Sequence, residues 1–204
     1  MTMFSNRSSF FDDDDLRVTF NWEDPLASPS RVHLNNEPIL SETFNYSQAN
    51  SQTFSAGYFS LYQKCLVRYK NSSSKEAEAI LDISHSKLQV FSNGFSLTKN
   101  GNTFDFTSKN DTVIKIWVTQ LKGICVLVTF HDDYKALKMI GRGSFAKVYL
   151  VESKTTGHQF AVKAFTKEGV LLSNKNNAKT SIINEIDIMR CITHENIIKL
   201  YEVY

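Results

Sequence analysis

Long apolar runs are missing from this sequence, and none approaches the roughly 18 residues that a membrane-spanning helix needs. Residues 1–11 lack a basic start followed by an apolar middle, so they do not predict a secretory signal. Cysteine is also scarce: Cys65, Cys125 and Cys191 are scattered and odd in number, which argues against a disulfide framework or a zinc cluster. We expect three packing cysteines in a reducing compartment, with the cytoplasm as the default location.

The sequence also lacks a large excess of charge of either sign, since the formal net charge is only +2. A value this small gives no reason to expect nucleic acid as a partner. Residues 1–63 are nevertheless acidic, with eight acidic and three basic residues, and the first 37 residues lack hydrophobic periodicity. We predict a disordered tail over residues 1–37, in which the acidic run 12–15 is a solvated or interacting segment.

From residue 38 to about 130, short apolar and aromatic runs alternate with clusters of turn residues. Several short strands at close spacing predict a small sandwich or barrel. The turn at residues 100–102, Asn-Gly-Asn, separates two alternating segments and predicts a hairpin. The candidate strands are 39–44, 57–62, 66–69, 79–83, 87–91, 95–98 and 104–106.

The hydrophobic period then changes to that of a helix. Asp111 can cap a helix N-terminus with its carboxylate, and Trp117 stands in the middle of the apolar face that follows. The residues at helical spacing are Val113, Ile114, Trp117, Val118, Leu121, Ile124, Cys125 and Val128. The pattern therefore predicts one amphipathic helix after the strands.

Six or seven strands followed by one amphipathic helix resemble a pleckstrin-homology (PH) domain, which we assign to residues 38–131. The resemblance depends on the aromatic strand 57–61, the strand 79–83 and Trp117. It implies a module for phosphoinositides, which many PH domains hold with Lys and Arg on the first two strands. Residues 32–63 contain no Lys or Arg, so phosphoinositide binding at that position is doubtful. We expect a protein-docking role, or packing against the next domain.

Residues 140–149, IGRGSFAKVY, place Gly141 and Gly143 between two strand-like segments. Glycine lets backbone N–H groups approach phosphate oxygens without a Cβ in the way. The pattern resembles the Gly-rich loop of protein kinases, G-x-G-x-x-G-x-V, with Ala146 in place of the third glycine. The resemblance implies that Phe145 covers the phosphates and that Val148 lies against the adenine ring.

Residues 160–163, FAVK, end a second apolar strand on a lysine. They resemble the V-A-I-K strand of kinases, in which the lysine contacts the α and β phosphates. Lys163 follows Gly143 by 20 residues (163 − 143), which fits two strands and a turn. The resemblance further implies that Ala161 packs on adenine.

Residues 181–190 predict a helix whose apolar stripe is made by Ile182, Ile186 and Met189, with Ile183 alongside. Glu185 lies on this helix, 22 residues after Lys163 (185 − 163). Glu185 resembles the αC glutamate that pairs with the strand lysine in active kinases. Asp187 is the competing carboxylate, but residues two apart on a helix do not share a face. Residues 193–203, THENIIKLYEV, resemble the kinase stretch after αC, where His194 is structural rather than a base.

Four such pieces in order identify residues 134–204 as similar to a protein kinase N-terminal lobe, of the serine/threonine, calcium/calmodulin-dependent type. By this resemblance the catalytic residues are Lys163 and Glu185, and no residue is a metal ligand. The residues that it assigns to ATP are Ile140, Gly141, Arg142, Gly143, Ser144, Phe145, Ala146, Val148, Ala161 and Lys163.

The H-R-D and D-F-G motifs, which supply the catalytic Asp and the Mg²⁺ ligands in kinases, do not occur in the chain. We therefore expect this polypeptide alone to lack kinase activity, and Mg²⁺ to enter only in a complete kinase domain. The overall prediction is an α+β chain in which a PH-like barrel precedes a kinase N-lobe of antiparallel sheet plus αC helix. It is a piece of a kinase that phosphorylates proteins, or alternatively a non-catalytic adaptor or decoy that binds partners through the PH-like domain.

Overall fold

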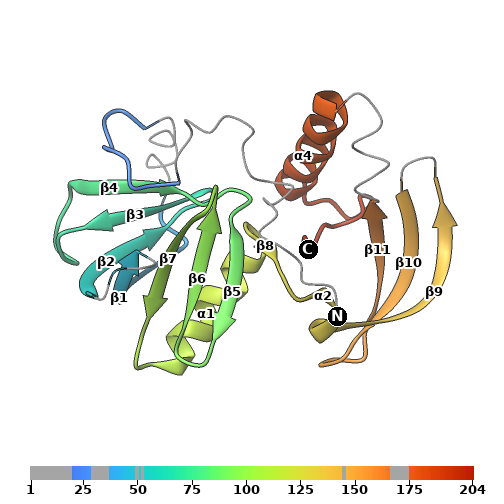
Figure 1. The fold of residues 1–204 in the computed structure, drawn as a ribbon, viewed down its shortest axis with the longest axis horizontal. Coiled ribbons are helices and arrows are strands. Elements are labelled where there is room, and N and C mark those ends of the chain that lie inside the picture. The colour runs from blue at the N-terminus through green and yellow to red at the C-terminus, as the bar shows by residue number, and fades with distance from the viewer. Residues whose placement is uncertain (1–19, 29–36, 49–50, 52, 144–145, 166–174) are drawn as a thin grey trace. The chain divides into compact units, whose positions relative to one another are not determined.

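The structure is a computed structural model that describes residues 20–28, 37–48, 51, 53–143, 146–165 and 175–204. The chain divides into two compact units (Figure 1). The first unit comprises Met1–Val128 and Tyr201–Val203, and the second comprises Thr129–Leu200 and Tyr204. Among the described residues, no helix is long and apolar enough to cross a membrane.

Strands dominate the first unit, as the short alternating runs predict. Their order in the sheet is β4-β3-β2-β1-β7-β6-β5-β8, and all neighbours are antiparallel except β5 and β8. The strands are β1 (Leu40–Gln48), β2 (Ser55–Leu61), β3 (Cys65–Tyr69), β4 (Ala77–Asp82), β5 (Lys87–Phe91), β6 (Gly94–Lys99), β7 (Asn102–Thr107) and β8 (Val126–Leu127). Seven antiparallel strands followed by a helix confirm the predicted PH-like arrangement.

The hairpin between β6 and β7 has the turn that its residues predict. Asn100 and Gly101 both have positive φ, 50° and 79°, as a tight type I′ turn requires. Lys99 pairs with Asn102 directly across the turn. The Asn-Gly signal therefore determines the register in which the two strands meet.

Helix α1 (Asp111–Lys122) starts one residue away from the predicted cap. Asn110, not Asp111, is the N-cap, and its side-chain oxygen accepts hydrogen bonds from the backbone N–H of Thr112 and Val113. Asp111 instead lies in the first turn, where its charge still favours the helix dipole. Asn and Asp are about equally good N-caps, so the sequence alone does not separate them.

Helix α1 also ends earlier than the apolar pattern predicts. The N–H of Gly123 bonds to the carbonyls of Gln120 and Leu121 and closes the last turn. Residues 124–128 are therefore not helical, and β8 pairs in parallel with β5 instead. The edge of β5 offers backbone hydrogen-bond partners to residues 126–127, and these bonds could not form if the helix continued. The apolar residues after the helix therefore belong to a strand.

The core of the first unit is aromatic. Phe44 on β1 is 1% exposed, and its ring lies 4.9 Å from Trp117 of α1 and 5.7 Å from Phe95 of β6. Phe95 stacks on Phe106 at 5.2 Å, and Phe59 meets Phe106 edge-on at 5.4 Å. Edge-to-face and offset pairs of this kind add to the burial of apolar area, and they tie the helix to both halves of the sheet.

Residues 20–28 correct the prediction of a disordered tail over residues 1–37. Phe20 is 3% exposed and its ring meets Phe104 at 5.5 Å. Glu23 exchanges two backbone hydrogen bonds with Ile80 on strand β4. Phe20 and Trp22 bury enough apolar surface to order this short segment. Nine residues are too few to show a hydrophobic period, so the sequence did not reveal it. Residues 1–19 and 29–36 of the predicted tail lie outside the described residues.

The second unit contains a three-stranded antiparallel sheet in the order β11-β10-β9. Its elements are α2 (Phe130–Asp133), β9 (Tyr134–Arg142), β10 (Ala146–Ser153), β11 (Gln159–Phe165) and α4 (Lys175–Cys191). Gly157, with a φ of 72°, sits in the turn between β10 and β11, where a residue without a Cβ adopts that backbone freely. The α+β class and the sheet-plus-helix lobe are confirmed.

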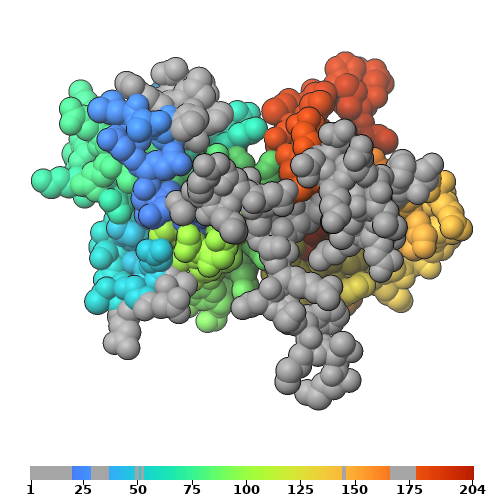
Figure 2. Space-filling view, turned by 45° about the horizontal axis from the view of Figure 1, so that its top comes forward, coloured from blue at the N-terminus to red at the C-terminus, as the bar shows by residue number. Residues whose placement is uncertain are grey.

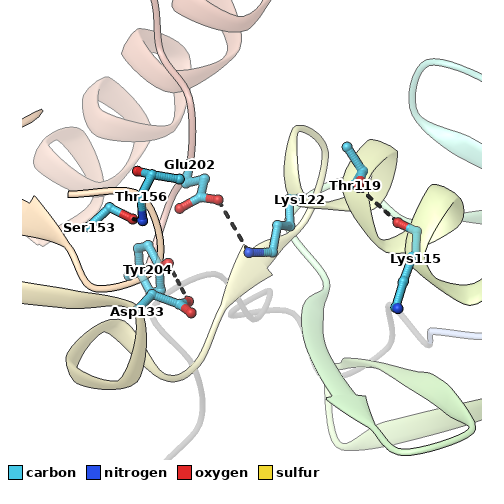
Figure 3. A network of polar contacts seen from close by, with 8 residues as sticks. All are labelled: Lys115, Thr119, Lys122, Asp133, Ser153, Thr156, Glu202 and Tyr204. Atoms are coloured by element: carbon cyan, nitrogen blue, oxygen red, sulfur yellow. Dashed lines mark hydrogen bonds and ion pairs between the residues drawn. The ribbon is translucent and has the colours of Figure 1, made fainter. Parts of the chain in front are cut away.

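Residues 192–204 form neither helix nor strand. Within the first unit, Val203 accepts a hydrogen bond from the N–H of Leu127 at 2.7 Å, and Glu202 lies 3.4 Å from Lys122 Nζ (Figure 3). Within the second unit, the Tyr204 hydroxyl donates to Asp133 Oδ2 at 2.7 Å (Figure 3). The stretch that resembles the kinase segment after αC is thus tied down by individual hydrogen bonds rather than by a strand ladder.

The cysteines differ in environment, which corrects the prediction of three packing thiols. Cys65 and Cys125 are fully buried, whereas Cys191 at the end of α4 is exposed. Burial, together with the charge of Asp82, raises the pKa of the Cys65 thiol to about 12. Because the thiolate is the reactive form, Cys65 is protected both by its low accessibility and by its protonation.

We therefore expect a thiol reagent at pH 8 to modify Cys191 rapidly and to leave Cys65 and Cys125 unmodified until the protein unfolds. Titration with a chromogenic disulfide reagent, with and without denaturant, measures this difference. Cys191→Ser should abolish the rapid reaction. Rapid modification of Cys65 in the folded chain would contradict the assignment of a buried, protonated thiol.

Candidate nucleotide-binding site

Strand register brings three of the predicted site residues into one row. Val148 on β10 lies opposite Gly141 on β9 and opposite Lys163 on β11. Residues directly opposite one another in an antiparallel sheet point to the same face. Gly141 and Lys163, which are 22 residues apart in the sequence (163 − 141), and Val148 between them therefore share one face of the sheet.

Alternation along β11 puts Ala161 on the face that carries Lys163. Ala161 pairs with Leu150, two positions after Val148 on β10, and side chains two apart in a strand share a face. Ala161, Lys163 and Phe165 are all exposed, whereas Val162 and Ala164 between them are half-buried. This exposed face has small apolar side chains beside one cation, which suits an adenine ring beside its phosphates.

The charged centre of the site is an ion pair between sheet and helix. Lys163 Nζ donates to Glu185 Oε1 of α4 at 2.5 Å, and the two side chains are 47% and 45% exposed. The ammonium also lies 5.0 Å from the ring centroid of Phe165, a cation–π distance. Two neighbours thus restrain the lysine, while nearly half of it remains open to an anionic ligand.

Phe165 was not among the predicted site residues. It stands two positions after Lys163, so strand alternation alone would have placed it on the same face. Its ring adds weak attraction for the ammonium and limits the positions that the lysine side chain can take. The alternating pattern of residues 161–165 was enough to predict the position of Phe165. The resemblance to the kinase V-A-I-K strand ends at Lys163, so it did not include this residue.

The helix explains why Glu185 rather than Asp187 meets the lysine. On α4, a residue two positions away points to a different side, and Asp187 is half-buried where Glu185 is exposed. The predicted apolar stripe of this helix, which includes Ile182, Ile186 and Met189, is half-buried. Glu185 reaches the Lys163 ammonium of β11 from the exposed side of this helix.

The described residues leave room for a side chain at both glycines of the loop. A Cβ added to Gly141 would meet Val148 at 3.4 Å, and one added to Gly143 would meet the Ala146 carbonyl at 3.6 Å, both ordinary contacts. Neither glycine has a positive φ. Contacts with the described residues therefore do not require glycine at either position, and glycine lets a ligand approach the backbone closely, as a phosphate-binding loop does.

The rest of the loop is described in part. The N–H of Gly143 bonds to the Ala146 carbonyl at 2.8 Å and closes the turn. Ile140 falls at a β-bulge, because the pairing of Val148 with Gly141 passes to Tyr149 with Met139, and Arg142 is exposed opposite Lys147. Two predicted contacts, Ser144 and Phe145, lie outside the described residues.

His194 has a structural environment. Its Nδ1 accepts the N–H of Asn196 at 3.1 Å, and its carbonyl accepts the N–H of Ile197. A ring nitrogen that accepts from the backbone stabilises the turn after α4. Within the part of the chain that the structure describes, no group of three or more His, Cys, Asp or Glu side chains could hold a metal ion.

Comparison with known proteins identifies the class of the second unit. Residues 134–204 match the family model of the protein kinase domain. Over 77 residues the chain is 38% identical to calcium-dependent protein kinase 4 of Plasmodium berghei, covering 38% of this chain and 14% of that protein. Residues 134–204 thus carry part of a protein kinase domain, as the four motifs predict.

A second relative is also named as a protein kinase. The chain is 39% identical over 70 residues to CBL-interacting protein kinase 30 of Oryza sativa subsp. japonica, which covers 34% of this chain and 14% of that protein. The chain therefore spans about one seventh of the length of these relatives.

The first unit resembles solved PH domains only at low identity. The Slm1 PH domain, solved in complex with phosphoserine, is 18% identical, with a TM-score of 0.36 over 39% of this chain and 88% of that chain.

Proposed function

We propose that residues 134–204 bind ATP as the front part of a serine/threonine kinase that transfers the γ-phosphate to protein hydroxyls. The ion pair of Lys163 with Glu185 is the observation that carries this proposal. A cation held at the end of a strand, beside a glycine loop, stabilises phosphate charge without having to reorganise when the nucleotide arrives. Glu185 acts by orienting Lys163.

Each remaining residue has a role that follows from its position. The backbone of Gly141 and Gly143 approaches the phosphates, and Val148 and Ala161 pack against the adenine ring. Kinases in general use Mg²⁺, which neutralises the charge of the triphosphate when it is bound. No residue of 134–204 is proposed as a metal ligand.

For the first unit we propose a protein-docking or regulatory role rather than phosphoinositide binding. Residues 32–63 contain no Lys or Arg. The cations that follow are Lys64, Arg68 and Lys70, and of these Arg68 on β3 already has partners. Its guanidinium donates to the Tyr46 hydroxyl at 2.5 Å, and its Nε lies 3.4 Å from Glu78 Oε2. A phosphate that bound Arg68 would have to displace Tyr46 and Glu78.

An ATP acyl-phosphate probe tests the proposed site directly. A lysine ε-amine near the bound phosphates attacks the acyl carbonyl, forms an amide and releases ATP, so the label marks the lysine in contact with the nucleotide. We expect mass spectrometry to find Lys163 labelled well above Lys138 and Lys147, and excess ATP to suppress that label. Even labelling of all exposed lysines, or labelling that ATP does not suppress, would contradict the proposal.

A further inference from the structure

The chain has two Asn-Gly pairs, Asn93-Gly94 and Asn100-Gly101, and both fall at hairpins of the first unit. Asn93 precedes the first residue of β6 in the turn after β5, and Asn100-Gly101 is the turn between β6 and β7. Figure 1 labels these three strands, and Figure 2 shows the strands of this unit in cyan to green. An asparagine that precedes glycine can react with its own backbone, because no Cβ shields the nitrogen that follows it.

The reaction is a deamidation. The backbone nitrogen of the glycine loses its proton and attacks the side-chain carbonyl carbon, Cγ, of the asparagine. A bond forms between this nitrogen and Cγ, the bond from Cγ to the side-chain nitrogen breaks, and ammonia leaves a succinimide ring behind. Water then opens the ring at either carbonyl. The product is aspartate, or isoaspartate in which the backbone runs through Cγ, and the reaction needs no oxidant or reductant.

The strand register leaves Asn100 and Gly101 outside the ladder of backbone pairs. Lys99 pairs with Asn102 and closes the hairpin, so the two residues between them are the loop. Gly101 is exposed, and a Cβ built on it would meet nothing within 4 Å among the described residues. The attacking nitrogen can therefore move toward Cγ of Asn100 without opening a strand pair.

Gly94, in contrast, belongs to the sheet. It is buried, and it pairs with Phe91 on β5 and with Thr107 on β7. A Cβ built on Gly94 would overlap the backbone carbonyl of Phe106, so strand β7 passes directly beside it. The nitrogen of Gly94 can reach Cγ of Asn93 only if this part of the sheet opens, and core strands open at a much higher free-energy cost than loops.

We propose that Asn100 is a site of spontaneous deamidation, with water as the co-reactant, and that the sheet protects Asn93 from the same reaction. The reaction puts a carboxylate next to Lys99 in the turn that sets the register of β6 and β7. Aspartate keeps the backbone length, and Asp-Gly forms the same type I′ turn as Asn-Gly. Isoaspartate lengthens the backbone of a two-residue loop, so it should disturb the hairpin.

Trypsin separates the two sites for measurement. Cleavage after Lys87, Lys99 and Lys109 places Asn93 in the peptide 88–99 and Asn100 in the peptide 100–109. The full chain is incubated in heavy-oxygen water at mildly alkaline pH, which favours loss of the backbone proton, and is then digested in ordinary water. Heavy oxygen in the new carboxylate marks conversion in the intact chain, and tandem mass spectrometry locates it within each peptide.

The same chain incubated in urea is the control. In the folded chain we expect Asn100 to convert about tenfold or more faster than Asn93, because a loop opens more easily than a core strand. In urea the two residues should convert at similar rates, since both are then followed by an unstructured glycine. The proposal is overturned if the two convert at equal rates in the folded chain. It is equally overturned if Asn100 stays intact in the folded chain over a period in which both convert in urea.

Asn100→Asp separates the effect of the new charge from that of the longer backbone. Strand β7 carries Phe104 and Phe106, both buried in the core, so a disturbed hairpin should weaken the first unit. We expect the isoaspartate form, isolated by chromatography, to unfold at a lower urea concentration than Asn100→Asp, and Asn100→Asp to unfold like the wild type. An isoaspartate form as stable as Asn100→Asp would contradict the effect that we assign to the longer backbone.

Discussion

On the proposed function, replacing Lys163 with methionine is expected to lower phosphoryl transfer by a kinase domain that contains residues 134–204 about 100-fold or more. Methionine keeps the length and apolar stem of the side chain but removes the ammonium that Glu185 holds at 2.5 Å. Since phosphoryl transfer depends mainly on positioning and charge neutralisation, the loss should appear chiefly in kcat. Steady-state assays of wild-type and Lys163→Met versions of the full-length protein, with ATP varied, measure it.

Lys147→Met is the matched control. Lys147 is next to Val148 on β10 and pairs with Arg142 and Ala164, so alternation places its side chain on the opposite face from Lys163. We expect near wild-type activity from this variant. Comparable losses at both positions, or full activity of Lys163→Met, would mean that the ion pair is structural rather than part of the nucleotide site.

The contact between Lys163 and Glu185 was predictable because the chain combines a fixed spacing with strand alternation. Intervals of 20 and 22 residues connect Gly143, Lys163 and Glu185, and strands of the lengths observed bring the lysine and the glutamate together. The α+β class followed from the change between strand and helix periods. These signals are local in the sequence, so they can be recognised without knowledge of tertiary contacts.

Features decided by tertiary contacts could not be predicted. Phe20 and Trp22 are ordered by rings that come from distant strands, and a nine-residue segment has no period to reveal this. Strand β8 exists because β5 leaves an edge open beside it. The apolar residues 124–128 fit a helix equally well until Gly123 closes the last turn.

Phe44→Ala is expected to lower the free energy of unfolding of the first unit by about 3–5 kcal/mol. The ring is 1% exposed and contacts Phe95 and Trp117 at 5.7 Å and 4.9 Å. Its removal leaves a cavity where the sheet meets α1, and aromatic neighbours on two elements cannot both move to fill it. Phe54→Ala is the control, because Phe54 is 55% exposed and surface truncations change stability by about 0.5 kcal/mol or less.

Tryptophan fluorescence isolates this effect because the chain has two tryptophans, Trp22 and Trp117, and both belong to the first unit. Urea unfolding followed by fluorescence therefore reports the first unit alone, while far-UV circular dichroism reports both units. Phe44→Ala should shift the fluorescence midpoint strongly and leave any separate circular dichroism transition of the second unit in place. If Phe44→Ala shifts the fluorescence midpoint no more than Phe54→Ala does, then the aromatic cluster around Trp117 is not what holds the helix to the sheet.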